Sequence, residues 1–168
     1  MKVVIVGCGR VGGVVAGVLD AAGHEVVIID TSTRAFERLP STFGGNAVRA
    51  DGTDEDSLRR AGAGGADVFL SLTEGDNRNV MAAQLAAEAL GIGRVVAKIN
   101  DPVRASAYAE LGIATICRTD LLAYELLSFI GLPAGERPAV RSAARHAHLD
   151  ESEEEESVAA GVQPAQEI

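Results

Sequence analysis

KVVIVGCGRVGGVVAGV, at residues 2–18, and EVVIID, at residues 25–30, form the most informative pattern in this chain. The apolar, β-branched run at residues 2–6 predicts a strand that is buried on both faces. The glycines that follow have the spacing G-x-G-x-x-G, and the alanines and valines after them recur at the period of a helix. The second apolar strand ends in an acid, Asp30, eighteen residues after the last of those three glycines.

This order of elements is what a nucleotide-binding turn requires. Gly7 permits the tight turn, Gly9 lets a pyrophosphate approach the backbone, and Gly12 lets the helix pack against the strand. The helix N-terminus offers free N–H groups and the positive end of a dipole to phosphates, and Asp30 can accept hydrogen bonds from ribose hydroxyls. The glycine motif alone is a weak signal, because glycines in such a turn can be purely structural. Strand, helix, second strand and terminal acid together predict nucleotide binding.

Strand and helix patterns alternate along the first 131 residues. The expected strands lie at residues 2–6, 25–30, 46–50, 67–72, 94–99 and 114–117. The helical patterns lie at residues 10–22, 32–40, 54–61, 76–90, 102–111 and 120–131. This alternation predicts an α/β fold, a Rossmann-type doubly wound parallel sheet of six strands. Right-handed crossovers then give the strand order 3-2-1-4-5-6, with ligand expected over the C-terminal edge where strands 1 and 4 diverge.

The net charge of −9 is concentrated at one end of the chain. Residues 150–168 hold seven of the 24 acidic residues and no basic one, so the remainder has 17 acids against 15 bases. We therefore predict a nucleotide-binding domain at residues 1–131, a Pro-, Ala- and Arg-rich linker at 132–149, and a disordered acidic tail at 150–168. The tail is either a solubilising appendage or a partner-binding segment. The body has no basic footprint, which argues against a nucleic-acid partner.

Several chemistries and locations find no support in the sequence. No apolar run is long enough to span a bilayer, so direct membrane insertion is not expected, and no secretory signal precedes the first strand. Cys8 and Cys117 have neither metal nor redox spacing, which favours a reducing cytoplasm. The chain has no Tyr-x-x-x-Lys pair and no Gly-x-Ser-x-Gly elbow, and the predicted fold leaves no segment for a substrate pocket. A cofactor site without these groups points to sensing, so we do not expect an enzyme.

Five segments in order resemble a known family. They are GCGRVGGVVAGVL at 7–19, EVVIID at 25–30, RADGTDEDSLRRAGAGGAD at 49–67, SLTEGDNRNVMAAQLA at 71–86 and VVAKINDPVRASAYAELGI at 95–113. Together they resemble the regulator-of-potassium-conductance N-terminal domain (RCK-N or TrkA-N) of cytosolic Trk/Ktr potassium-uptake subunits. The resemblance covers about residues 1–131. Full-length members usually carry a second small domain, and here the predicted linker and acidic tail stand in its place.

The resemblance implies a regulatory role. Such domains form homodimers, often assemble into rings of eight, and bind NAD(H) or ATP/ADP. Their ligand state gates a separate, membrane-embedded potassium channel or transporter subunit. The expected protein is therefore a cytosolic nucleotide-binding gating subunit of a Trk/Ktr-type uptake system, peripheral to the inner face of the plasma membrane. Two alternatives stay open: a small NAD-dependent oxidoreductase, and a nucleotide-binding adaptor that pairs with a longer homologue of the family.

The family's phosphate and ribose contacts carry over to the first half of the fold. The resemblance implies a phosphate loop that binds through backbone N–H groups, made of Gly7, Cys8, Gly9, Arg10 and Val11. The Arg10 side chain either reaches a terminal phosphate, sometimes across the dimer, or is an exposed arginine at a helix start. Asp30 should hold the ribose and disfavour a 2′-phosphate by charge repulsion. NAD is therefore expected over NADP, although Arg34 could partly neutralise the charge of Asp30.

The remaining assignments fall at the ends of later strands. Asp51 and Gly52 either contact adenine or only form the turn into the next helix, and Thr73 could bond the second half of a dinucleotide. Asn77 and Asn79 are interpreted as residues of a helix cap and a dimer surface.

Two further residues concern charge at the predicted crevice. Lys98, near the end of the fifth strand, is interpreted as a phosphate partner because an ammonium gives a charge-assisted contact. Asp120 holds the approximate place where some relatives bind a divalent cation through an acid, and otherwise caps the last helix.

Overall fold

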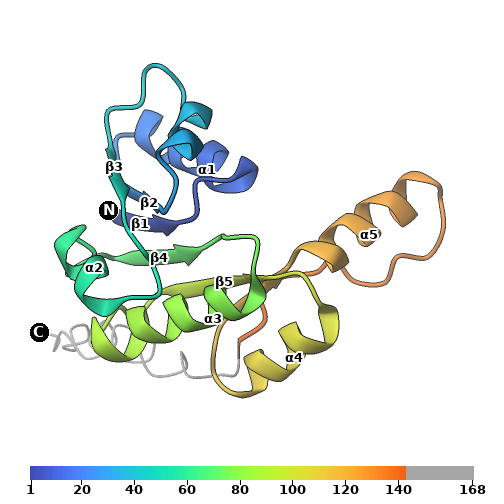
Figure 1. The fold of residues 1–168 in the computed structure, drawn as a ribbon. Coiled ribbons are helices and arrows are strands. Elements are labelled where there is room, and N and C mark those ends of the chain that lie inside the picture. Colours follow the sequence, from blue (N-terminus) through green and yellow to red (C-terminus); the bar gives the residue numbers. More distant parts are fainter. Residues whose placement is uncertain (143–168) are drawn as a thin grey trace, which may run out of the picture.

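The computed structural model describes residues 1–142 and has a six-stranded sheet in the order β3-β2-β1-β4-β5-β6 (Figure 1). All five strand pairs are parallel. The strands are β1 (Lys2–Val6), β2 (Glu25–Asp30), β3 (Asn46–Arg49), β4 (Val68–Ser71), β5 (Val95–Ile99) and β6 (Thr115–Cys117). The predicted fold class and strand order are confirmed.

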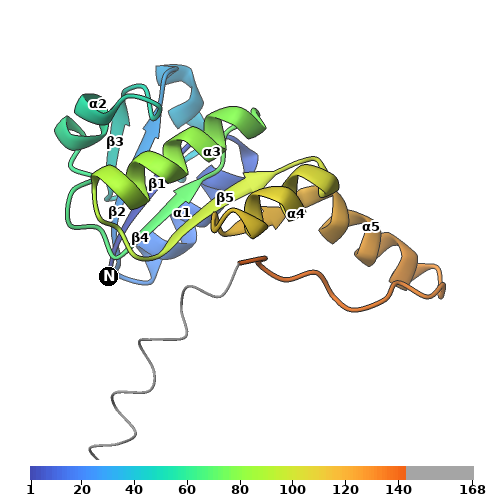
Figure 2. The ribbon, with the colours of Figure 1, turned by 90° about the horizontal axis from the view of Figure 1, so that it is seen from below.

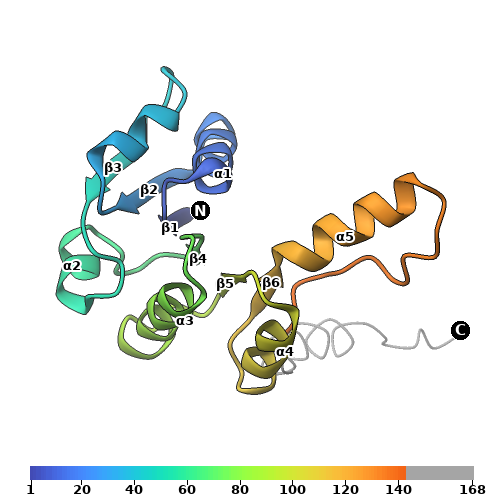
Figure 3. The ribbon, with the colours of Figure 1, turned by 45° about the vertical axis from the view of Figure 1, so that its right-hand side comes forward.

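Helices cover both faces of this sheet. They are α1 (Arg10–Ala21), the 3₁₀ helix η1 (Thr33–Arg38), α2 (Glu55–Arg60), α3 (Asp76–Gln84), the π-helical turn η2 (Leu85–Ala89), α4 (Pro102–Glu110) and α5 (Arg118–Phe129). α1 and η1 lie on one face of the sheet, and α2, α3 and α4 lie on the other, where Figure 2 shows them in front of the strands (Figures 2 and 3).

The alternation of side chains along β1 explains why the strand is apolar throughout. Val3 and Ile5 pack in the cluster under α1 and η1, whereas Val4 and Val6 pack against α2 and α3 on the opposite face. All four are at most 4% exposed. A strand buried on both faces has no polar position, which is the pattern that predicted it.

Two predicted helices differ from regular α-helix. The segment expected at residues 32–40 is a short 3₁₀ helix, which ends just before Pro40. Its chain packs tightly on α1, because a Cβ at Gly17 would lie 3.0 Å from the Pro40 ring and one at Gly13 would lie 3.4 Å from Arg38. The helix expected at 76–90 is α-helical only to Gln84 and then widens into the π-helical turn.

α5 extends away from the body of the domain (Figure 3), and none of its residues is buried. The chain after it returns to the sheet edge, where Arg141 and Thr115 exchange two backbone hydrogen bonds of 2.8 Å. The predicted linker at 132–149 is described only as far as residue 142, and the predicted tail at 150–168 lies outside the described residues. Within residues 1–142, no helix has the length and hydropathy needed to cross a membrane.

Candidate functional site

A cavity of about 250 Å³ opens where the C-terminal ends of the first four strands diverge. This is the position at which doubly wound sheets bind ligands. Among its lining residues are seven of the predicted site residues: Gly7, Cys8, Gly9, Asp30, Asp51, Gly52 and Thr73. Their gathering at one place agrees with the sequence analysis, and their role in binding stays a prediction.

The glycine loop between β1 and α1 has the backbone that a phosphate loop needs. Gly7 has φ +102°, a conformation that favours glycine. A Cβ at Gly12 would lie 2.0 Å from the Gly7 carbonyl oxygen, so only glycine lets α1 approach the loop this closely. A Cβ at Gly9 would meet no atom within 4 Å. The open side of Gly9 is therefore space that a pyrophosphate can enter, and the loop fits the group that the motif predicts.

Two of the five predicted N–H donors already have protein partners. The Gly7 N–H donates to the Ile29 carbonyl at 2.7 Å, and the Cys8 N–H donates to Asp30 Oδ2 at 2.8 Å. The expectation that the whole loop offers its N–H groups is therefore too broad. No side chain caps the N-terminus of α1, so the N–H groups of its first turn are the available donors, and they carry the positive end of the helix dipole.

Asp30 is held in place by the backbone on both sides. Its Oδ2 accepts from Cys8 N, and its Oδ1 accepts the Ser32 N–H at 2.9 Å. A carboxylate has about four lone-pair positions, so two remain for ribose hydroxyls. The predicted Arg34 is different: its side chain is 88% exposed and lies 4.0 Å from Glu37.

Asp51 and Gly52 form the wall after β3. A Cβ at Gly52 would lie 2.3 Å from a Val6 methyl group, so this chain passes directly over the end of β1. Asp51 Oδ1 accepts the Thr53 N–H at 2.9 Å and the Thr53 hydroxyl at 2.7 Å, and these bonds hold the pKa of its carboxyl below the ordinary value. The helix cap is Asp54, which accepts from Ser57 N. Asp51 is thus free of the capping role and faces the cavity.

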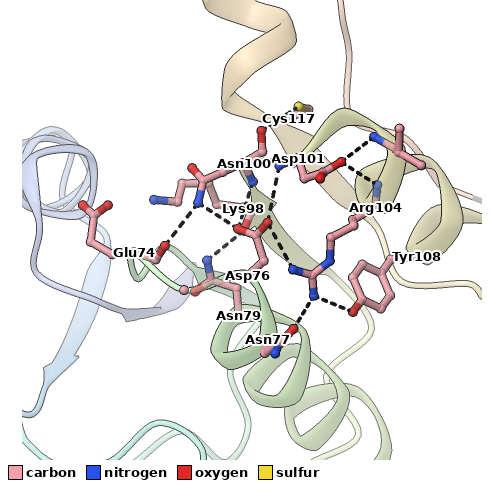
Figure 4. A network of polar contacts seen from close by, with 12 residues as sticks. Glu74, Asp76, Asn77, Asn79, Lys98, Asn100, Asp101, Arg104, Tyr108 and Cys117 are labelled. Carbon is pink, nitrogen blue, oxygen red and sulfur yellow. Dashed lines mark hydrogen bonds and ion pairs between the residues drawn. The ribbon is translucent and has the colours of Figure 1, made fainter.

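Asn79 is a buried bridge, and its interpretation as a residue of a helix cap or dimer surface is wrong. The side chain is fully buried and its amide donates to the carbonyls of Thr73 and Lys98, at 3.0 and 2.7 Å (Figure 4). Its Oδ1 accepts from Ser71 Oγ and from both the N–H and the hydroxyl of Thr73. Because the Thr73 hydroxyl proton is used here, that hydroxyl offers a ligand only acceptor positions.

A polar network beside Asn79 fixes the chain after β5. The Asp76 carboxylate accepts from the Asn100 side chain at 2.7 Å and from its N–H at 2.9 Å, and it lies 3.9 Å from Arg104 (Figure 4). Arg104 also bonds Asn77 and the Tyr108 hydroxyl. Asn77 is thus an exposed member of this network, and the loops after β4 and β5 are held together at the cavity edge.

A second cavity of about 570 Å³ adjoins the first and shares Gly9, Leu72 and Glu74 with it. The predicted Arg10, Val11 and Lys98 line this cavity, together with Arg118, Thr119, Leu122, Ala123 and Leu126 of α5. Lys98 is 5% exposed, and burial lowers the pKa of its ammonium.

Asp120 forms an ion pair with the Arg141 side chain. Its Oδ2 accepts from Arg141 at 2.5 Å, and the cap residue of α5 is Cys117, not Asp120. Within residues 1–142, no three acidic, histidine or cysteine side chains gather as metal ligands. A cation bound to a nucleotide takes many of its ligands from phosphate and water, so the assignment of Asp120 stays a prediction.

Comparison with known proteins identifies the fold's family. Residues 3–119 match the TrkA-N domain. The chain belongs to the TrkA-N domain family. The resemblance found from the five sequence segments is thereby confirmed.

Individual relatives and solved structures agree with this family assignment. The chain is 43% identical over 141 residues to the Trk system potassium uptake protein TrkA of Streptomyces coelicolor. The match covers 84% of this chain and 63% of that protein. It thus spans less than two thirds of that relative's length. The AMP-bound Kef CTD of Shewanella denitrificans superposes with a TM-score of 0.62 at 26% identity, over 80% of this chain and 84% of that one. The TrkA-N domain of Escherichia coli ybaL shares the fold, with a TM-score of 0.68 at 19% identity over 77% and 96%.

Two residues of this TrkA-N cavity were missed by the sequence analysis. Arg38 and Arg78 both line the first cavity. Arg38 lies four residues beyond Arg34 in η1, and its guanidinium donates to the Ala35 carbonyl at 3.4 Å. Arg78 is in the first turn of α3, and its charge helps to lower the pKa of Asp51 across the cavity. The only sequence signal for Arg78 was its place just after the fourth strand.

Proposed function

We propose that this chain is a cytosolic, nucleotide-binding regulatory subunit of a Trk/Ktr-type potassium uptake system. The observation that carries the proposal is the cavity at the glycine loop, where β1 and β4 diverge. It occurs in a chain that is 43% identical to a TrkA protein. The partner would be a membrane-embedded potassium channel or transporter subunit. The chain would act from the cytoplasm, at the inner face of the plasma membrane.

The ligand would be an adenine nucleotide, either NAD(H) or ATP/ADP. AMP in the Kef structure supports this class of ligand. In this chain the ribose would bond the free lone pairs of Asp30, and the base would lie against the wall made by Asp51 and Gly52. The phosphates would meet the N-terminus of α1 at the open side of Gly9.

Control of the partner requires two states of this subunit with unequal affinity for the ligand. A bound nucleotide shifts the balance between those states, and the coupling in such systems is typically about 1–3 kcal/mol. Binding without turnover is sufficient for this role, so we propose regulation and not hydride transfer.

In this role the subunit would act as a homodimer formed through α5. Four apolar side chains form one stripe that runs from the middle of this helix to the residue that follows it: Leu122, Leu126, Phe129 and Ile130, which are 57–89% exposed. A continuous apolar stripe of this kind marks an interaction surface. A second copy of the chain presents the same stripe, and a two-fold interface can pair like with like.

Phe129→Glu is expected to convert this dimer to a monomer, because a charge would replace the aromatic ring that is the most exposed side chain of the stripe. Light scattering after size-exclusion chromatography would show the mass fall by half. Ser128→Glu is the control, since the helical period places Ser128 away from the stripe. A wild-type monomer, or an unchanged mass of Phe129→Glu, would contradict the α5 interface.

Asp30→Ala is expected to weaken AMP and NADH ten- to a hundredfold in calorimetry. A hydrogen bond to a charged group contributes about 1.5–3 kcal/mol, and two ribose hydroxyls would lose their partner. In a strain that lacks the gene, growth at limiting potassium should return with the wild-type chain and not with this variant.

Asp20→Ala is the matched control for Asp30→Ala. Asp20 also accepts one backbone N–H, from Gly44 at 2.9 Å, but it lies at the far end of α1 from the glycine loop. Its loss should cost stability without changing nucleotide affinity. Unchanged affinity in Asp30→Ala would remove the ribose role. Consumption of NADH with a small carbonyl compound over many turnovers would favour the oxidoreductase.

A further inference from the structure

The Arg141 residue joins three elements at the β6 edge of the sheet. Its guanidinium donates to the Pro102 carbonyl at 3.1 Å and to the Ser106 hydroxyl at 3.0 Å, both on α4. It also donates to Asp120 Oδ2 on α5 at 2.5 Å. The backbone of the same residue exchanges its hydrogen bonds with Thr115 in β6. Arg141 therefore links α4, α5 and β6, although it lies outside all three.

The oxygens around this guanidinium are a carbonyl, a hydroxyl and a carboxylate. Hard divalent cations in proteins take oxygen ligands, and the sequence analysis assigned such a cation to Asp120. The guanidinium is always charged and presents several N–H donors, and it already takes Oδ2 of that carboxylate. A divalent cation does not fit beside it, because two cations would repel each other at close range. The two occupants therefore exclude each other.

Asp120 also lies on the side of α5 away from the second cavity. The α5 residues that line this cavity are Arg118, Thr119, Leu122, Ala123 and Leu126. At 3.6 residues per turn, Asp120 is nearly opposite Leu122 on the helix. A cation that arrived with a ligand of this cavity would meet α5 on its other side. The carboxylate is thus placed for Arg141 and not for the cavity.

The position of α5 depends strongly on the chain that returns along it, because none of the helix residues is buried. The described part of this returning chain, residues 132–142, pairs Arg141 with Asp120 and Arg137 with Glu125. The side chains of the Arg137 pair are 73% and 58% exposed, against 36% and 22% for the Arg141 pair. Exposed ion pairs contribute little to stability, so the Arg141 contact is the stronger of the two.

We propose that Arg141 is a tethered cation that positions the start of α5 against α4 and β6, in the place that a divalent cation would take at Asp120. This inference goes beyond the proposed function, because no nucleotide takes part in these contacts. α5 would keep its position without metal ions. If the Arg141 side chain were shortened, a small cation would enter the group of three oxygens and restore the contact.

Hydrogen exchange of the full chain, followed by mass spectrometry, tests how often α5 opens. Wild-type exchange at residues 118–129 should be the same with a chelator as with calcium chloride. Arg141→Ala should speed this exchange about tenfold, because the charged hydrogen bonds that resist opening are lost. Dilute guanidinium chloride or calcium chloride should slow it again, and sodium chloride at the same ionic strength should not. Arg137→Ala is the matched control and should change the rate less than about twofold.

Asp120→Asn distinguishes this contact from a general loss of stability. It should speed exchange in α5 as much as Arg141→Ala does, and the double variant should be no faster than either single one. Neither cation should slow exchange in a variant that lacks the Asp120 carboxylate, and β1 should keep its wild-type rate throughout.

Four results would overturn the proposal. They are a wild-type rate in Arg141→Ala, additive effects in the double variant, equal acceleration in β1 and α5, and failure of both cations to slow exchange in Arg141→Ala. Calcium that slowed exchange in wild-type α5, but not in Asp120→Asn, would return Asp120 to a metal and would also overturn it.

Discussion

Gly12→Ala is expected to destabilise the protein severely and to abolish nucleotide binding with it. The new Cβ would lie 2.0 Å from the Gly7 carbonyl oxygen and 3.1 Å from its carbonyl carbon. Both atoms are backbone, so α1 must move away from the loop or the loop must move from β1. Overpacking commonly costs about 1–3 kcal/mol and occasionally more, and a backbone clash this close belongs at the upper end. A fall in Tm of about 10 °C, followed by circular dichroism, would agree.

Gly9→Ala is the matched control, because it adds the same methyl group to the same loop. A Cβ at Gly9 meets no atom within 4 Å, and its φ of −78° and ψ of −167° are open to alanine. The variant should keep the wild-type Tm while its nucleotide affinity falls, since the methyl group occupies the side that the phosphates approach. Wild-type stability in Gly12→Ala, or full affinity in Gly9→Ala, would contradict this account of the loop.

The parts of the molecule that the sequence predicted well are those that local pattern determines. Val3 and Val4 belong to opposite faces of β1 and are both buried, so an unbroken apolar run was the expected signature of the strand. The helix predicted at residues 102–111 begins at Pro102, and the Asp101 side chain accepts from two N–H groups of α4. Each of these features depends on residues only a few positions apart.

The parts that were missed depend on packing between distant segments. Arg38 lines the cavity and Arg34 does not. The segment is a 3₁₀ helix, in which residues four apart lie on different faces, whereas in the expected α-helix they share one face. The Cys8 N–H is taken by Asp30, 22 residues away, which no local motif reveals. Asn79 in turn donates to a carbonyl 19 residues further on, in β5. A polar residue in an amphipathic helix is ordinarily on the surface, and only the three-dimensional structure shows that Asn79 is buried.

Asn79→Ala is expected to cost about 3–5 kcal/mol of folding free energy, because it deletes a fully buried side chain that satisfies several polar groups at once. The Lys98 carbonyl and the Thr73 N–H would each lose their partner, and a buried unsatisfied group costs about 1–3 kcal/mol. Thr73 also packs on the glycine loop, since its nitrogen lies 2.8 Å from where a Gly7 Cβ would be. Nucleotide affinity should therefore fall along with the midpoint of urea unfolding.

Asn77→Ala removes the same side chain two positions earlier on α3, where it is exposed and bonds only Arg104 among the described residues. Surface changes of this kind usually stay within about 0.5 kcal/mol, so its unfolding midpoint should match the wild type. Asn79→Asp gives a second arm: the carboxylate retains the acceptor but faces the carbonyls of Thr73 and Lys98 without a hydrogen to donate. It should be at least as unstable as Asn79→Ala at neutral pH and should recover as the pH falls and the carboxyl becomes protonated. Equal stability of Asn79→Ala and Asn77→Ala would show that the bridge between β4 and β5 does not hold the cavity together.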